Sequence, residues 1–224
     1  MKTMKFALAP LALAMLAGSA VAQQPQGQAA QAPPQPMSFF VTSVGKGDGG
    51  NLGGLAGADA HCQTLAAAAG RGNVTWRAYL SQAAGGPNAV VHARDRIGRG
   101  PWFNARGALI ASNVDDLHQD RNNIRKPTAL NEKGEEVKGV GDTPNQHDTL
   151  TGSDSTGRLV PGNAALTTCN NWTSNGAGNA MVGHHDRLGG GSSSWNSVHS
   201  TRSCSQDDLV ATGGAGLFYC FVAQ

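Results

Sequence analysis

The side chains best suited to metal binding or catalysis form one triplet, His184-His185-Asp186, in the last quarter of the chain. Two imidazoles and a carboxylate are ligands that zinc accepts, and a bound zinc ion can activate water for hydrolysis. Neighbouring residues of a strand point to opposite faces, so both histidines converge on one ion only if they lie in a loop. The triplet therefore predicts either a metal site or a polar surface loop, and the sequence leaves both open.

A second group collects oxygen ligands, with Asp115, Asp116 and Asp120 followed by Asn122 and Asn123. Calcium takes about six to eight oxygen ligands, and such a loop supplies several of them. The spacing does not match an EF-hand, and the alternative is a solvated loop with helix-capping side chains. Calcium at these aspartates and zinc at the histidine triplet are the two metal hypotheses that the sequence offers.

Two tryptophans suggest a surface for carbohydrate. Trp172 and Trp195 flank loops rich in Gly and Ser, and Asn196 follows the second of them. Proteins hold sugars by stacking an aromatic face under the ring and hydrogen-bonding its edge, so these residues are candidate ligand contacts together with the 184–186 triplet. The alternative is that both indoles belong to the core. No Gly-x-Ser-x-Gly turn surrounds Ser192–Ser194, and we expect a binding protein, not an enzyme. The alternatives are a metal-dependent hydrolase that uses the 184–186 triplet and a structural envelope domain without a small ligand.

The four cysteines are Cys62, Cys169, Cys204 and Cys220. An even number of cysteines predicts disulfides in an exported chain, and the amino-terminal residues considered below predict export. The absence of a CxxC pair argues against a zinc ribbon or a thioredoxin-like redox site. Four cysteines allow three pairings, and their number and spacing alone do not choose among them.

The elements that must position these residues are strands and one helix. Alternation and β-branched or aromatic content predict strands over 38–42, 76–81 and 217–222, and helical spacing of apolar residues predicts a helix over 58–69. The strand at the carboxyl end has no neighbour in sequence, so we expect it to pair with the strand at 38–42. The residues from 83 to 162 read mainly as loop.

The cysteine pairing follows if the predicted helix packs on the last strand. Cys62 lies on the apolar face of that helix, and under this condition it bonds to Cys220, which leaves Cys169 for Cys204. The loops from about 104 to 203 would then project from a rigid base and form the binding face.

The amino-terminal residues predict export. Lys2 and Lys5 precede an apolar run over 6–16, and Ala20-Val21-Ala22 matches the small-x-small pattern of signal peptidase, so residues 1–22 are the expected signal peptide. The alternative is an amino-terminal membrane helix, but the run is short for one. Ser19 stands where a lipoprotein has Cys. Residues 23–36 contain Gln, Pro and Ala without charge and predict a disordered linker before a domain over 37–224.

The charge of that domain is balanced. The chain has 17 Lys and Arg and 15 Asp and Glu, and removal of Lys2 and Lys5 with the signal peptide leaves 15 of each sign. No basic block stands out, so we expect neither nucleic-acid binding nor stable insertion in a membrane. The predicted location is secreted or periplasmic, where disulfides persist.

Several motifs together resemble the endostatin domain of basement-membrane collagens, over most of residues 38–223. The order and spacing of the pieces match that domain, and each piece is short. They are Gly57-Ala58-Asp59-Ala60-His61-Cys62-Gln63, Trp76-Arg77-Ala78-Tyr79-Leu80-Ser81, Gly152-Ser153-Asp154-Ser155-Thr156-Gly157-Arg158, Cys169-Asn170-Asn171-Trp172-Thr173, Cys204 and Leu217-Phe218-Tyr219-Cys220.

The resemblance implies the C-type-lectin-like superfamily: an α+β fold with loop-in-loop topology, paired terminal strands and two nested disulfides. The resemblance says less about function, and we expect from the loop-rich binding face a partner that is a glycan or an extracellular or cell-surface protein. The motifs for calcium-dependent sugar binding are missing, because no Glu-Pro-Asn or Gln-Pro-Asp occurs and Trp195-Asn196 is followed by Ser197. The histidines of endostatin's zinc site have no counterpart between 37 and 60. Collagen endostatins bind heparan sulfate through clustered arginines, whereas here the densest arginine stretch, over 94–106, is interrupted by Asp95.

Overall fold

A computed structural model of the chain describes residues 1, 3, 35–85, 89–189 and 193–223. Contacts divide the chain into two units, 1–33 and 34–224. Apart from residues 1 and 3, the expected signal peptide over 1–22 lies outside the described residues, as does the expected linker up to residue 34. The fold reported below is that of the second unit.

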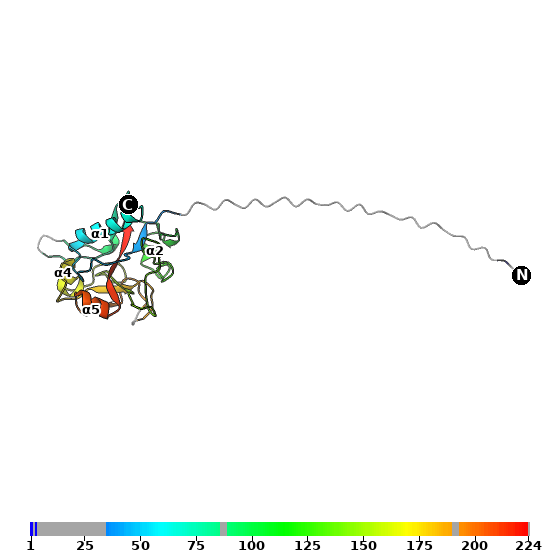
Figure 1. The fold of residues 1–224 in the computed structure, drawn as a ribbon. Coiled ribbons are helices and arrows are strands. Elements are labelled where there is room, and N and C mark those ends of the chain that lie inside the picture. The colour runs from blue at the N-terminus through cyan, green and yellow to red at the C-terminus, as the bar shows by residue number, and fades with distance from the viewer. Residues whose placement is uncertain (2, 4–34, 86–88, 190–192, 224) are drawn as a thin grey trace. The chain divides into compact units, whose positions relative to one another are not determined.

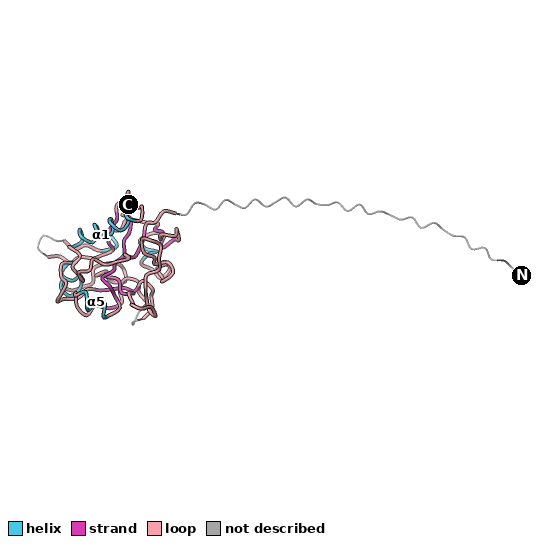
Figure 2. The backbone as a smooth tube through the Cα atoms, in the orientation of Figure 1, coloured by secondary structure: helices cyan, strands magenta, loops and turns pink. Residues whose placement is uncertain are grey.

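Loops make up most of this unit, and the regular elements between them are short (Figure 2). The helices are α1 (Gly54–Ala68), the 3-10 turn η1 (Ala93–Asp95), α2 (Val114–Leu117), α3 (Ala164–Thr167), α4 (Cys169–Trp172) and α5 (Gln206–Ala211). The strands are β1 (Phe39–Val41), β2 (Trp76–Ala78), β3 (Trp102–Phe103), β4 (Leu109–Ala111), β5 (Asp148–Leu150), β6 (Met181–His184), β7 (His199–Ser200) and β8 (Gly214–Val222).

β8 is the longest strand and the centre of the main sheet, whose order is β1-β8-β5-β6-β7 with β2 also paired to β8. Phe39 of β1 is paired with Phe221, which confirms that the first and last strands of the domain lie together (Figure 1). The amino-terminal half of β8 pairs with β5 in the parallel sense, with Thr149 beside Leu217. This single strand therefore connects the terminal strands to the part of the sheet that carries β5, β6 and β7.

The side chains of β8 alternate between two buried apolar clusters. Phe218 and Cys220 belong to the cluster that contains α1, Trp76 and Trp172. Their neighbours Tyr219 and Phe221 belong to the other cluster, with Trp102, Trp195 and Ile110 among its members. A strand covered on both faces reads as a continuous apolar run, which is why its sequence signal is so clear.

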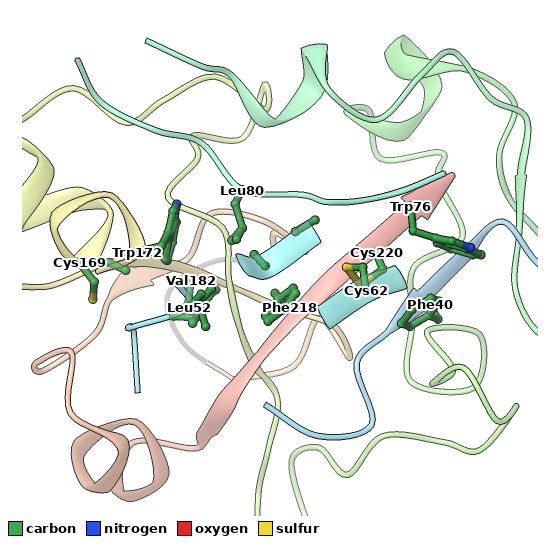
Figure 3. Close-up of a cluster of buried hydrophobic side chains, with 14 of the residues drawn as sticks. Phe40, Leu52, Cys62, Trp76, Leu80, Cys169, Trp172, Val182, Phe218 and Cys220 are labelled. Atoms are coloured by element: carbon green, nitrogen blue, oxygen red, sulfur yellow. A yellow bond between two sulfur atoms is a disulfide. The ribbon is translucent and has the colours of Figure 1, made fainter. Parts of the chain in front are cut away.

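The two disulfides join Cys62 to Cys220 and Cys169 to Cys204, as expected, and the first of them fastens α1 to β8 (Figure 3). The sequence separations are 158 and 35 residues, so the smaller loop lies inside the larger one. In the chain-entropy description these closures contribute about 5 and about 4 kcal/mol. Disulfides of this kind indicate an oxidising compartment.

The predicted elements are confirmed with altered ends. The helix begins at Gly54, earlier than expected, and the second strand stops at Ala78, although Leu80 still packs in the same cluster as Trp76 and Ala78. α4 was not predicted: its residues Cys169 to Trp172 all have positive φ, from 47° to 65°, and form one left-handed turn. The mixed helix and sheet content agrees with the expected α+β class. Among the described residues, no helix has the length and apolar character needed to cross a bilayer.

Candidate metal centre

The edge of the main sheet brings three chain segments to one point. β5 and β6 are antiparallel, and Asp148 of β5 lies directly opposite His184 of β6. β7 pairs with the other side of β6 and supplies His199. His147 precedes β5 and stacks on His184, with 3.8 Å between the ring centroids. Three imidazoles from separate segments therefore surround one carboxylate.

All three rings point Nε2 at the same oxygen of Asp148. The distances from Oδ1 are 3.0 Å to His184, 3.3 Å to His147 and 3.5 Å to His199. Asp148, His147 and His184 are buried, whereas the side chain of His199 is 39% exposed. Neither carboxylate oxygen of Asp148 has a hydrogen-bond partner of good geometry.

Contacts of Nδ1 with backbone carbonyls fix the tautomers of His184 and His199. Nδ1 of His184 lies 2.9 Å from the carbonyl of Leu188, and Nδ1 of His199 lies 3.1 Å from the carbonyl of Ser200. A carbonyl oxygen only accepts, so both Nδ1 atoms carry hydrogen. In a neutral ring Nε2 then carries no hydrogen and presents a lone pair. These two Nε2 atoms are 3.2 Å apart. Two lone pairs and a carboxylate at this separation repel one another unless a cation or a proton lies between them.

The spacing suits a tetrahedral ion. Zinc binds imidazole nitrogen at about 2.0–2.1 Å and carboxylate oxygen at about 2.0–2.2 Å, which puts neighbouring ligand atoms about 3.3 Å apart. The separations of 3.0 to 3.5 Å around Asp148 Oδ1 and of 3.2 Å between the imidazoles match this value. Asp148, His184 and His199 could therefore hold a metal ion. His147 lies beside this group, with its Nε2 3.3 Å from Oδ1 of Asp148.

Asp186 supports the centre from behind. Its Oδ1 lies 3.5 Å from Nδ1 of His147 and accepts from the Leu188 amide, while Oδ2 accepts from the Val140 amide. A carboxylate behind a ligating imidazole orients the ring and raises its basicity. His147, His184 and Asp186 also form a group close enough to hold an ion, so Asp186 is the alternative oxygen ligand.

Burial and mutual contact set the charges in this cluster. Burial alone would raise the pKa of Asp148 and of Asp186, but the contacts of Asp148 with His184 and His199, and those of Asp186 with His147 and two backbone amides, hold both pKa values below their usual range. The contact with Asp148 raises the pKa of His199. For His147, burial acts to lower the pKa, but Asp186 and Asp148 outweigh it and the pKa is raised. The carboxylates therefore attract positive charge, as protons or as a metal ion.

The predicted triplet is divided by the turn that follows β6. His184 and Asp186 join the cluster, whereas His185 points away, with Nε2 3.2 Å from the Lys138 carbonyl. Burial lowers the pKa of His185 to about 4, which keeps this ring neutral. The reading of the triplet as a polar surface loop is wrong, because all three side chains are buried. His147, Asp148 and His199 were missed by sequence reasoning, since only the pairing of β5, β6 and β7 shows that they are neighbours.

The aspartates considered for calcium do not converge. Asp115 and Asp116 lie in the first turn of α2, where Asn113 caps the helix. Asp115 pairs with Arg94, and Asp116 accepts from the Ser112 amide. Asp120 is fully exposed. Helix capping and surface ion pairs account for these groups, in agreement with the alternative considered from the sequence.

The two tryptophans are core residues. Trp172 is completely buried and donates its indole N–H to the Ser81 carbonyl. Trp195 donates to the Leu117 carbonyl and packs against Tyr79 and Tyr219, with centroids 4.8 and 5.1 Å away. Neither indole presents an open face on which a sugar ring could stack.

Asn196 is buried and makes internal hydrogen bonds. Its amide donates to the hydroxyl of Tyr79 and to the carbonyl of Asp154. This residue therefore fixes the loop around 154–155 against Tyr79. Asn196 also lines a pocket, together with Trp195 and Arg187.

Comparison with known proteins adds no assignment. No family model matches the chain, and no curated protein matches it. The conclusions about the site therefore come from its geometry.

Proposed function

We propose that this chain is an exported, non-catalytic binding domain that holds a zinc-like divalent metal ion on Asp148, His184 and His199, with His147 as a fourth ligand. The observation that carries the proposal is the convergence of three imidazole Nε2 atoms on one buried carboxylate oxygen, at 3.0 to 3.5 Å. Mixed nitrogen and oxygen ligands of this number are typical of zinc. A carbonyl or carboxylate behind each imidazole completes the pattern.

The ion has a structural role in this proposal. The ion connects β5, β6 and β7, which are short strands. Without it, these strands would bring buried carboxylates and imidazoles together with no ion to balance the charge of the carboxylates. The turns beside these strands, near Val140 and Leu188, donate to Asp186 and are fixed by the same cluster. A metal at this point would stabilise loops of the proposed binding face.

Two further observations support the wider setting. The nested disulfides and the pairing of β1 with β8 agree with the endostatin-like, C-type-lectin-like architecture that the motifs resemble. Disulfides also agree with a secreted or periplasmic location. A glycan or an extracellular or cell-surface protein is the partner class that we propose on this basis.

The test is metal binding by the purified, oxidised protein. We expect one equivalent of zinc by elemental analysis and a titration that His184→Ala weakens at least about 100-fold, since it removes a ligand. The matched control is His185→Gln, which changes the adjacent imidazole that faces Lys138 and should keep the affinity. Equal zinc binding by wild type and His184→Ala would contradict the proposal. Zinc-dependent hydrolysis of ester, amide or glycoside substrates would favour a metal-dependent hydrolase instead.

A further inference from the structure

A pocket of about 220 Å³ opens beside the turn that follows β6, and its lining includes Arg187, His118, Ser155 and Ser193. It is separate from the metal cluster, although Arg187 directly follows Asp186. The edge of Trp195 contributes apolar surface to it. The pocket thus combines one cation, hydroxyl groups and an aromatic edge.

Arg187 lacks the partner that a buried guanidinium requires. Its side chain is only 9% exposed, and its Nε is buried without a hydrogen-bond partner. Nη2 donates to the amide oxygen of Asn122, a neutral group. The nearest carboxylate, Asp120, is fully exposed and lies 3.8 Å from Nη1, beyond hydrogen-bond distance. A planar guanidinium with free donors matches a carboxylate, which can accept two parallel hydrogen bonds.

The surroundings increase the demand for an anion. The Arg125 guanidinium adds a second positive charge close to the buried Arg187 side chain. An acidic ligand would offset both the burial of the Arg187 guanidinium and the charge of Arg125.

The remaining wall of the pocket is polar but uncharged. His118 donates from Nδ1 to the Val114 carbonyl and accepts at Nε2 from the hydroxyl of Tyr79, and burial lowers its pKa. A neutral imidazole and the hydroxyls of Ser155 and Ser193 suit the hydroxyl groups of a sugar better than a second charge. One carboxylate and several hydroxyls are the groups of a uronic acid.

We infer that this pocket binds the carboxylate of an acidic saccharide unit of the uronic-acid class, with Arg187 as the anchor. The carboxylate accepts from Nη1 of Arg187, and the sugar hydroxyls meet Ser155 and Ser193. Asp120 at the rim competes for the same guanidinium. This inference concerns a different site from the metal centre and stands without it.

The experiment titrates the mature, oxidised protein with glucuronate, glucose and acetate by NMR or calorimetry. We expect glucuronate to bind most tightly, acetate more weakly and glucose not measurably. Arg187→Gln should weaken glucuronate binding at least about tenfold, because hydrogen bonds to charged groups are the stronger ones. Asp120→Asn should strengthen it about two- to fivefold by removing the competing carboxylate. Arg121→Gln is the matched control, since Arg121 is a nearby arginine with an exposed side chain.

Three results would overturn the inference as a whole, and a fourth would overturn its saccharide part. They are equal affinities for glucuronate and glucose, unchanged glucuronate affinity in Arg187→Gln, and no binding of glucuronate at all. Acetate binding as tight as that of glucuronate would overturn the saccharide assignment. Should Arg187→Gln fail to fold, Arg187→Lys keeps the positive charge without the planar pair of donors, and glucuronate should still bind it more weakly than the wild type.

Discussion

The two ends of the main sheet are built on opposite principles. Around the carboxyl half of β8, Phe39 stacks on Tyr219 and meets Phe221 edge to face, and the Cys62–Cys220 disulfide lies on the other face. At the other end, His147, Asp148 and His184 are equally buried but leave carboxylate and imidazole atoms without hydrogen bonds. An apolar core needs no further partner, whereas buried charge does, and this difference points to the ligand-binding end of the molecule.

The largest effect expected from this comparison is at the apolar end. Replacing Cys62 and Cys220 together by Ala should lower the free energy of unfolding by about 5 kcal/mol, because the bridge closes the longest loop of the domain. Denaturant titration measures the change, with the Cys169 and Cys204 double replacement as the comparison, for which we expect about 4 kcal/mol. The loss should be the same with zinc and with a chelator. A loss that occurs only without zinc would show that the two ends are not independent.

A smaller effect is expected from the carboxylate behind the metal ligands. Asp186→Asn keeps the size of the side chain but weakens the support of His147, and we expect zinc affinity to fall about 10- to 100-fold. Competition with a chelating dye measures it. Asp208→Asn, a change to an exposed ion pair with Arg202, is the control and should leave zinc affinity unchanged. A loss as large as that of His184→Ala would mean that Asp186 itself ligates the ion.

The smallest effect is on the pH dependence of zinc binding. The pKa values of His147 and His199 are raised, so without metal their contribution to stability is complete below about pH 6.5 and is lost as the pH rises through the raised values. Zinc must displace these protons, so its stabilising effect should run the other way and grow between pH 6 and pH 8. We expect about a tenfold gain in affinity over this interval, measured as the shift in melting temperature on adding zinc. A zinc effect that is constant or falls with pH would contradict the imidazole ligand set.

The sequence by itself determined the parts of this protein that depend on local pattern. β8 reads as a strand because every residue from 217 to 222 is apolar or aromatic, and α1 reads as a helix because small apolar residues recur at helical spacing. Once these two elements are placed together, the pairing of Cys62 with Cys220 follows. These features are local or rest on one contact between strong elements, so periodicity is enough to predict them.

Only the tertiary structure decided the composition of the metal centre and of the Arg187 pocket. β5 and β7 have three and two residues, too few for any periodic signal, yet their pairing with β6 brings His199 to Asp148. The turn after β6 sends His184 and Asp186 to one site, His185 to the Lys138 carbonyl and Arg187 to another site. Sequence pattern encodes which residues are buried in an element. Which short segments meet, and where each side chain of a turn points, depends on contacts between residues far apart in the chain.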